Sequence, residues 1–421
     1  MQRNIWMVFL VLLIYFVISF LTNILGPIIP DLITSFKLNL GLAGFLPFSF
    51  FVAYGIMSIP AGLLVEKYGE KITLLIAFLL AFLGAFAFAV WTSFPVALTS
   101  LFIIGAGMAI LQVVINPLLR TSGGEENYAF YSVLAQLFFG AASFLSPLLY
   151  SYLVNHVHTG LENPWMNFFD RYVPADLKWA SLYWVFALVA FLMIIVIVLV
   201  RMPKVQLRDD EKMDTGAGFR QLISSRTVWL YFTGIFAYVG TEQGIANWAS
   251  KFLQTYHGTD PATTGATVIA YFWGLMTAGC LLGLILLKIF DSRRVLSTFV
   301  LAAGITLLVA LFGPERAAII AFPLCGFFAS VMWSIIISLG LNSVPQHHGT
   351  LAGILCSGIA GGAVISLFIG ALGDLVGLRY AMLFILITLG YIFWLSRWAK
   401  PLVNNVTVSR WSDLFKSQTW K

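Results

Sequence analysis

Apolar runs repeat along this chain, separated by short breaks that carry charged residues, glycine and proline. Each run is about 20 residues or longer, which is the length that a helix needs to cross the hydrocarbon core of a bilayer. Six runs precede residue 203 and six follow residue 226. The pattern therefore predicts twelve membrane-spanning helices, near 5–33, 40–63, 72–92, 95–120, 127–154, 179–202, 227–255, 265–288, 294–313, 316–342, 348–371 and 377–399.

The composition is that of an integral membrane protein. Hydrophobic residues make up 60% of the chain and charged residues only 10%, whereas charged residues make up about 25% of a soluble domain. We expect an all-α membrane fold with two similar six-helix bundles, at 1–202 and 227–400, joined by a linker at 203–226 and followed by a tail at 401–421. The three cysteines lie in apolar runs, so neither a disulfide framework nor a metal site is expected.

The basic residues are distributed unevenly between the two sides of this layout. If the N-terminus is cytoplasmic, all lysines and arginines lie on the cytoplasmic side except Lys37, Arg171, Lys178, Lys251, Arg316 and Arg379. This bias follows the positive-inside rule. We therefore expect a multi-pass protein of the cell (inner) membrane with both termini in the cytoplasm. The net charge of +6 is then an orientation signal and a contact with anionic lipid, and nucleic acid is not expected as a partner.

The stretch YVGTEQGIANW, residues 238–248, places an acid inside the seventh predicted helix. Counted from the start of that helix, Glu242 lies ~22 Å along the axis, close to mid-membrane. An ionised carboxylate there costs about 2.5 to 3.5 kcal/mol on insertion scales, so it must face water, find a partner or be protonated. Glu242 is therefore a candidate functional acid, able to accept hydrogen bonds from the hydroxyls of a bound solute or to bind Na⁺ or H⁺. The alternative is a structural hydrogen bond to a neighbouring helix.

Amide and aromatic side chains on other predicted helices suit a sugar site. Amides both donate and accept hydrogen bonds, as sugar hydroxyls do, and aromatic faces suit the apolar C–H side of a pyranose. Each has an alternative explanation, because amides also hold membrane helices together, tryptophans often mark the interface, and an Asn can satisfy backbone groups that a following proline frees. With Glu242, the candidate substrate-binding residues are Asn23, Gln112, Asn116, Gln136, Asn247, Trp273 and Trp333.

The segment GLLVEKYGEK, residues 62–71, lies between the second and third predicted helices. It resembles the loop motif of the major facilitator superfamily, G-x-L-x-D-R-x-G-R-K, with Glu66 in place of the Asp, Lys67 in place of the Arg, and Glu70 in place of a basic residue. Its glycines let two helix ends approach closely, and its charges can lock one conformation. The alternative is an ordinary polar turn with helix capping. The expected cytoplasmic gate consists of Gly62, Glu66, Lys67, Gly69 and Lys71, with Arg120 and Glu125 as charged partners.

Longer stretches are similar to a narrower group, the fucose/proton symporter family of sugar transporters. They are GAGMAILQVVINPLL (105–119), GGEENYAFYSVLAQ (123–136), YVGTEQGIANW, SVMWSIIISLG (330–340) and GILCSGIAGGAVISLFIGALGD (353–374). In that family an aspartate in the first helix and a glutamate in the fourth take part in proton coupling and sugar binding. This chain has Gly26 and Gln112 at the aligned positions, and Phe139 and Ser334 replace a family Asn and Pro. The resemblance thus implies sugar transport but does not carry over the family's proton mechanism.

These observations predict a monomeric secondary transporter that imports a monosaccharide or related polyhydroxylated solute by alternating access. Coupling to Na⁺ or H⁺ is expected, with Glu242 as the coupling acid and with no other cofactor. The alternatives are an uncoupled facilitator or exporter of a more hydrophobic molecule, and a transporter-like sugar sensor. The sequence has no H-E-x-x-H or G-x-S-x-G motif, so an enzyme is not expected.

Overall fold

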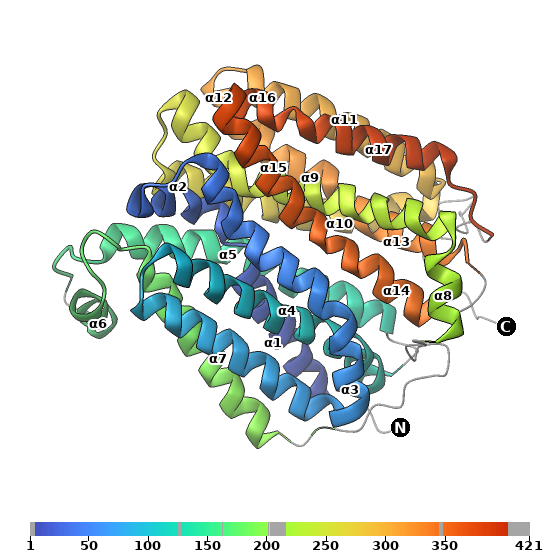
Figure 1. The fold of residues 1–421 in the computed structure, drawn as a ribbon, viewed down its shortest axis with the longest axis horizontal. Helices are drawn as coiled ribbons and strands as arrows, with labels where there is room; N and C mark the ends of the chain where they lie inside the picture. The colour runs from blue at the N-terminus through green and yellow to red at the C-terminus, as the bar shows by residue number, and fades with distance from the viewer. Residues whose placement is uncertain are drawn as a thin grey trace.

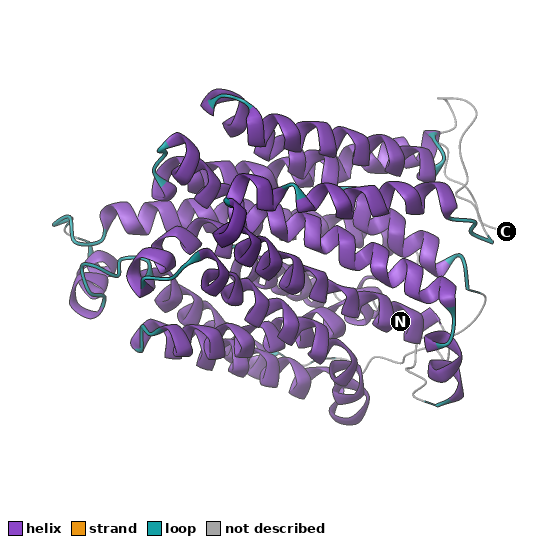
Figure 2. Cartoon of the chain, turned by 45° about the horizontal axis from the view of Figure 1, so that its top comes forward, coloured by secondary structure: helices purple, strands orange, loops and turns teal. Residues whose placement is uncertain are grey.

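The computed structural model of the chain describes residues 5–124, 128–161, 163–200, 202, 216–344 and 348–402. Within these ranges all regular structure is helical (Figures 1 and 2). The first bundle contains α1 (Ile5–Thr22), α2 (Leu25–Phe36), α3 (Leu40–Val90), α4 (Phe94–Gly123), α5 (Tyr128–His156), α6 (Pro164–Tyr172) and α7 (Ala180–Leu199). The short α8 (Ala217–Ile223) lies in the predicted linker. Residues 203–215 of that linker and residues 403–421 of the predicted tail fall outside the described ranges.

The second bundle begins with a single long helix. Its elements are α9 (Arg226–His257), η2 (Pro261–Gly265), α10 (Ala266–Ile289), α11 (Ser292–Phe312), α12 (Glu315–Ala329), α13 (Met332–Leu341), α14 (His348–Ser357), η3 (Gly358–Ala360), α15 (Gly361–Val376), α16 (Leu378–Met382) and α17 (Phe384–Trp398). Eleven spans in the described residues are long and apolar enough to cross a membrane. The 32-residue α9 is ~48 Å long and is more polar because it carries Glu242. Counting α9 as the twelfth, the predicted twelve-helix membrane fold is confirmed.

Several predicted helices are interrupted rather than continuous. The first span breaks at Asn23–Ile24 between α1 and α2, and the tenth breaks at Ser330–Val331 between α12 and α13. Pro27 falls in the first turn of α2, where a missing N–H removes no helical hydrogen bond. The second and third spans, in contrast, run on as α3, with one non-helical residue at Gly69 (φ +75°). A residue without Cβ adopts that φ at low cost.

The two bundles meet mainly through three helix pairs, α2 with α9, α3 with α15, and α5 with α10. A Cβ atom on Gly26 would overlap the carbonyl oxygen of Ala246, and one on Gly370 would overlap that of Leu40. We call the end of the molecule where α2 stops and α6 lies the α6 end, and the end that carries α8 and both chain termini the termini end (Figure 1). The tight contacts at Leu40 and Gly370 lie near the α6 end. Toward the termini end α3 also contacts α14, whereas α4 and α13 share no extensive contact among the described residues.

Candidate functional site

Glu242 interrupts a wholly buried stretch of α9. From Ala237 to Ser250, it is the one residue whose side chain stays partly accessible. Residues three and four positions away share its face of the helix, and Tyr238, Val239, Ile245 and Ala246 are all buried there. A lipid-facing helix surface would leave these neighbours exposed as well. The space that reaches Glu242 is therefore local and internal to the protein.

Both carboxylate oxygens of Glu242 accept hydrogen bonds from its own helix. Tyr238, one turn earlier, donates its hydroxyl to Oε2, and the Gln243 amide donates to Oε1 at 2.9 Å. Both donors are neutral, and no described Lys, Arg or His forms an ion pair with Glu242. The acid thus sits among hydrogen-bond donors rather than beside a compensating positive charge.

An aromatic ring and a thiol complete this side of the site. The Tyr238 ring packs against Trp333 of α13, with ring centroids 6.1 Å apart. Cys280 of α10 donates to the carbonyl of Ser330 at 3.3 Å, at the break between α12 and α13, and its thiol interacts electrostatically with Glu242. The Ser330 hydroxyl is buried without a hydrogen-bond partner. Sequence reasoning missed Tyr238, Cys280 and Ser330. Only Tyr238 carried a signal, its position four residues before Glu242.

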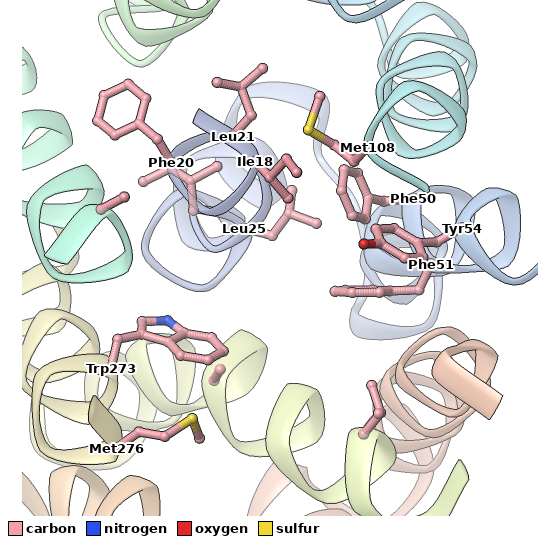
Figure 3. Packing of buried hydrophobic residues seen from close by; sticks show 14 of the residues in the cluster. Ile18, Phe20, Leu21, Leu25, Phe50, Phe51, Tyr54, Met108, Trp273 and Met276 are labelled. Carbon is pink, nitrogen blue, oxygen red and sulfur yellow. The ribbon is translucent and has the colours of Figure 1, made fainter. Parts of the chain in front are cut away.

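Trp273 extends the site along α10. Its side chain is 4% exposed, and its indole N–H has no hydrogen-bond partner. Figure 3 shows Trp273 and Met276 pointing from α10 into the region between the bundles, while Leu25 of α1–α2 and Phe51 of α3 lie across from them. Because Trp273 is buried inside the protein, it is not an interface tryptophan. The part of the first bundle drawn opposite is apolar, with Leu25 and Phe51 nearest to Trp273, whereas Phe20 and Leu21 point away from it.

Two of the predicted substrate-binding amides are engaged in helix packing. Asn23 donates to the Ser143 hydroxyl of α5 at 2.8 Å and to Ser19 at 3.4 Å. Asn247 donates to the Ser366 hydroxyl of α15 at 3.2 Å, and the adjacent Trp248 donates to the Ser366 carbonyl at 3.0 Å. In this conformation these amides join helices within one bundle. Their role in binding substrate stays a prediction.

The remaining predicted amides lie nearer the termini end. Gln112 on α4 is half-buried and Gln136 on α5 is exposed, whereas the Asn116 side chain lies outside the described residues. On α13, Ser334 and Ser338 are exposed one turn apart. An accessible amide and two hydroxyls inside membrane-spanning helices indicate a polar surface that water reaches, since lipid-facing positions are apolar.

The predicted gate segment makes contacts within the first bundle. The Lys71 ammonium donates to the carbonyls of Val198 and Val200, at 2.8 and 2.9 Å, and so caps the end of α7. Lys67 lies over the Tyr68 ring, 5.0 Å from its centroid. Gly69 supplies the reversal between the two halves of α3, and Gly62 lies inside that helix. The side chains of Glu66 and Arg120, and residue Glu125, fall outside the described parts, so the proposed lock between bundles stays a prediction.

The described residues hold no group of three His, Cys, Asp or Glu side chains that could bind a metal ion. What the site offers is one carboxylate, hydroxyl and indole donors, and aromatic surface.

Comparison with known proteins identifies a matching family and similar transporters. Residues 11–359 match the family model described as Major Facilitator Superfamily. The glucose/galactose transporter of Brucella abortus is 29% identical over 394 residues, which cover 90% of each chain. The L-fucose-proton symporter of Escherichia coli is 26% identical over 382 residues, which cover 86% of each chain.

Solved structures share the fold. The crystal structure of the Escherichia coli fucose:proton symporter matches with a TM-score of 0.65 at 22% identity, over 93% of this chain and 97% of that one. A bacterial homolog of the human lysosomal transporter Spinster, in an inward-facing and unoccupied conformation, matches with a TM-score of 0.76 at 14% identity, over 93% of this chain and 96% of that one.

Proposed function

Because the chain belongs to the Major Facilitator Superfamily and is a multi-pass membrane protein, we propose that it moves a monosaccharide or a similar polyhydroxylated solute across the membrane by alternating access. The observation that carries the proposal is Glu242, the one accessible residue in a buried stretch of α9. A carboxylate in an enclosed polar space can accept hydrogen bonds from two sugar hydroxyls. The names of the relatives, a glucose/galactose transporter and a fucose symporter, support a sugar as the solute.

The groups around Glu242 suit a sugar better than a charged solute. The indole N–H of Trp273 and the hydroxyl of Ser330 are buried without a hydrogen-bond partner in this conformation, so each can bond to a sugar hydroxyl once a movement of the helices exposes it. The rings of Trp333 and Tyr238 offer apolar surface to the C–H face of a pyranose. No described lysine or arginine is bonded to the acid, so an anionic solute would meet an uncompensated carboxylate.

We favour H⁺ over Na⁺ as the coupling ion. Tyr238 and Gln243 present donor hydrogens to both oxygens of Glu242. A sodium ion needs several oxygen ligands, and each oxygen of Glu242 has only one lone-pair site left once these two bonds are made. A proton needs only one carboxylate oxygen, and intramembrane acids with hydroxyl neighbours commonly serve as proton relays.

The proposed orientation puts the termini end in the cytoplasm, because most lysines and arginines flank that end. The bundles are then closed together at the outer side, and the polar surface of Gln136, Ser334 and Ser338 opens toward the cytoplasm. We propose import through the cell (inner) membrane by a monomer. Transport, rather than an enzymatic reaction, is the proposed activity.

One observation favours a second candidate function. The wall facing α10 in the first bundle is apolar and aromatic, with Leu25 and Phe51 among its members (Figure 3). Such a wall would also suit uncoupled transport or export of a more hydrophobic molecule. The two candidates differ in whether an ion gradient drives accumulation.

The test is uptake by purified protein in proteoliposomes, with a panel of labelled neutral sugars. Concentrative uptake is measured under a pH gradient, a Na⁺ gradient and neither, and counterflow is measured without a gradient. The proposal expects accumulation of at least one sugar under the pH gradient, and expects Glu242→Gln to abolish it. Glu315→Gln is the matched control, because Glu315 is an exposed acid at the start of α12.

The outcomes separate the alternatives. Accumulation under the Na⁺ gradient alone would replace the proton with sodium. Counterflow without accumulation under either gradient would favour the uncoupled carrier. Unchanged accumulation by Glu242→Gln would remove Glu242 from the mechanism, and sugar binding without any counterflow would favour a sensor.

A further inference from the structure

Asp374, at the end of α15 in the second bundle, binds the first residues of α3 in the first bundle. Its Oδ1 accepts a hydrogen bond from the backbone N–H of Leu40 at 2.9 Å, and its Oδ2 accepts one from Gly41 at 2.7 Å. The interacting residues are more than 330 positions apart in the chain. One carboxylate thus joins the two bundles through both of its oxygens at the α6 end.

The start of α3 provides the matching donors. The first N–H groups of a helix have no partner within the helix, and the aligned peptide dipoles make that end favourable for negative charge. Asn39 caps the third of these groups by accepting from Leu42 at 2.7 Å. The first two, at Leu40 and Gly41, are left to Asp374. The cap of α3 is therefore completed by a residue of the other bundle.

Small residues let the two helices come close enough for this bond. A Cβ atom on Gly41 would stand 3.0 Å from Asp374 Oδ2, and one on Gly44 would stand 2.9 Å from the Cα of Leu367. On the opposite helix, a Cβ on Gly370 would overlap the carbonyl oxygen of Leu40. The hydrogen bonds exist only at this close approach. Separation of α3 from α15 breaks both of them in one movement.

We propose that Asp374 is a latch that holds the α6 end of the transport path closed. Asp374 is exposed and the start of α3 is only half-buried, so water can replace both hydrogen bonds when the bundles part. The latch therefore stabilises the closed state by only a modest free energy. This allows the gate to open again in each transport cycle. The inference rests on the proposed alternating access but not on the identity of the solute or on Glu242.

The experiment measures the opening of the α6 end directly, in purified full-length protein in lipid nanodiscs without sugar. Cys280, Cys325 and Cys356 are replaced by alanine, and spin labels are attached to cysteines replacing Trp91 and Arg316. Both positions are exposed at the α6 end, Trp91 at the end of α3 and Arg316 in the first turn of α12. The distance distribution between the labels then reports the closed and open populations.

Asp374→Asn is expected to raise the ratio of open to closed molecules by about 5- to 30-fold, the factor that corresponds to losing a charged cap of this kind. Asp374→Ser, which is too short to reach both N–H groups, is expected to give the same shift. Asp176→Asn removes an exposed acid from a loop at the same end and is expected to leave the distribution of the parent unchanged. A parent-like distribution in either Asp374 variant overturns the latch, and a shift of equal size in Asp176→Asn does so as well. Sugar uptake is measured separately in proteoliposomes, and its failure in every variant would count against the proposed function alone.

Discussion

Tyr238 donates its hydroxyl hydrogen bond to the carboxylate of Glu242, one turn further along α9. The same tyrosine ring packs against Trp333 of α13. Through this residue the acid is connected to a helix that begins at a break in the tenth span. A change in the protonation or ligand contacts of Glu242 can therefore act through Tyr238 on α13. The exposed serines of α13 lie toward the termini end.

Tyr238→Phe tests that link. The carboxylate loses one of its two donors, and an unmade hydrogen bond to a buried charged group costs about 1–3 kcal/mol. We expect gradient-driven transport to fall by about 5- to 30-fold, which corresponds to a loss of about 1–2 kcal/mol, measured as initial rates over a range of substrate concentrations. Tyr231→Phe is the matched control, because Tyr231 lies on the same helix and its hydroxyl bonds to Ser343 at 2.9 Å, away from Glu242. Equal losses in the two variants would argue against a special role for Tyr238.

Asn23→Ala distinguishes packing from binding at the break between α1 and α2. Its amide donates to Ser143 and Ser19, and such bonds between membrane helices contribute about 0.6 kcal/mol on average, with a maximum near 1.7 kcal/mol. We expect a loss of stability in that range, measured by thermal unfolding in detergent, with KM for the solute nearly unchanged. A raised KM at unchanged stability would show that the amide serves the solute instead.

Gly26→Ala tests the closeness of the two bundles. A Cβ there would overlap the carbonyl oxygen of Ala246, and overpacking of this kind costs about 1–3 kcal/mol. This free-energy cost applies to the conformation that is closed at the α6 end. We therefore expect the variant to fold but to transport its solute more slowly. Gly390→Ala is the control, since nothing lies within 4 Å of the position that its Cβ would take. Normal transport rates in Gly26→Ala would mean that α2 and α9 can separate without loss of function.

Asp291 gives a pH-dependent contribution outside the membrane-spanning segments. Arg293, which donates to its carboxylate at 2.9 Å, holds the pKa of Asp291 below its usual value. Because the folded-state pKa is lowered, the stabilisation is present above the unfolded pKa of about 3.9 and is lost as the pH falls through the folded value. The pair is partly exposed, so its worth is at most about 1 kcal/mol. We expect Asp291→Asn to lower thermal stability slightly at pH 7 and to match the parent once the pH is below the folded-state pKa of Asp291. A difference that persists in acid would point to a cause other than charge.

The helices and the deep acid could be predicted because each depends on local sequence. A run of about 20 apolar residues has few alternatives to a membrane helix, and an acid within it is costly wherever the helix packs. Gly26 and the prolines beside it weaken a helix and so indicate a break near this position. The break at Asn23–Ile24 falls slightly earlier than these residues. The break at Ser330–Val331 has no such local mark.

Contacts between distant segments could not be predicted in the same way. Asp374 has its partners at Leu40 and Gly41, and nothing near Asp374 in the sequence indicates which helix start it caps. For the same reason Asn23 and Asn247 could be identified as polar but not as partners of Ser143 and Ser366. One sequence defines which side chains are unusual in a membrane helix. The packing decides whether they face a neighbour or an open space.

The central claim is that Glu242 faces an enclosed space that water and solute reach. In a variant without native cysteines, Glu242→Cys is exposed to a hydrophilic, membrane-impermeant thiol reagent, with Ile245→Cys as the buried control on the same helix, 1% exposed. The account predicts rapid labelling at position 242, slowed by the transported sugar, and little labelling at position 245. Labelling at position 242 as slow as at position 245 would contradict it.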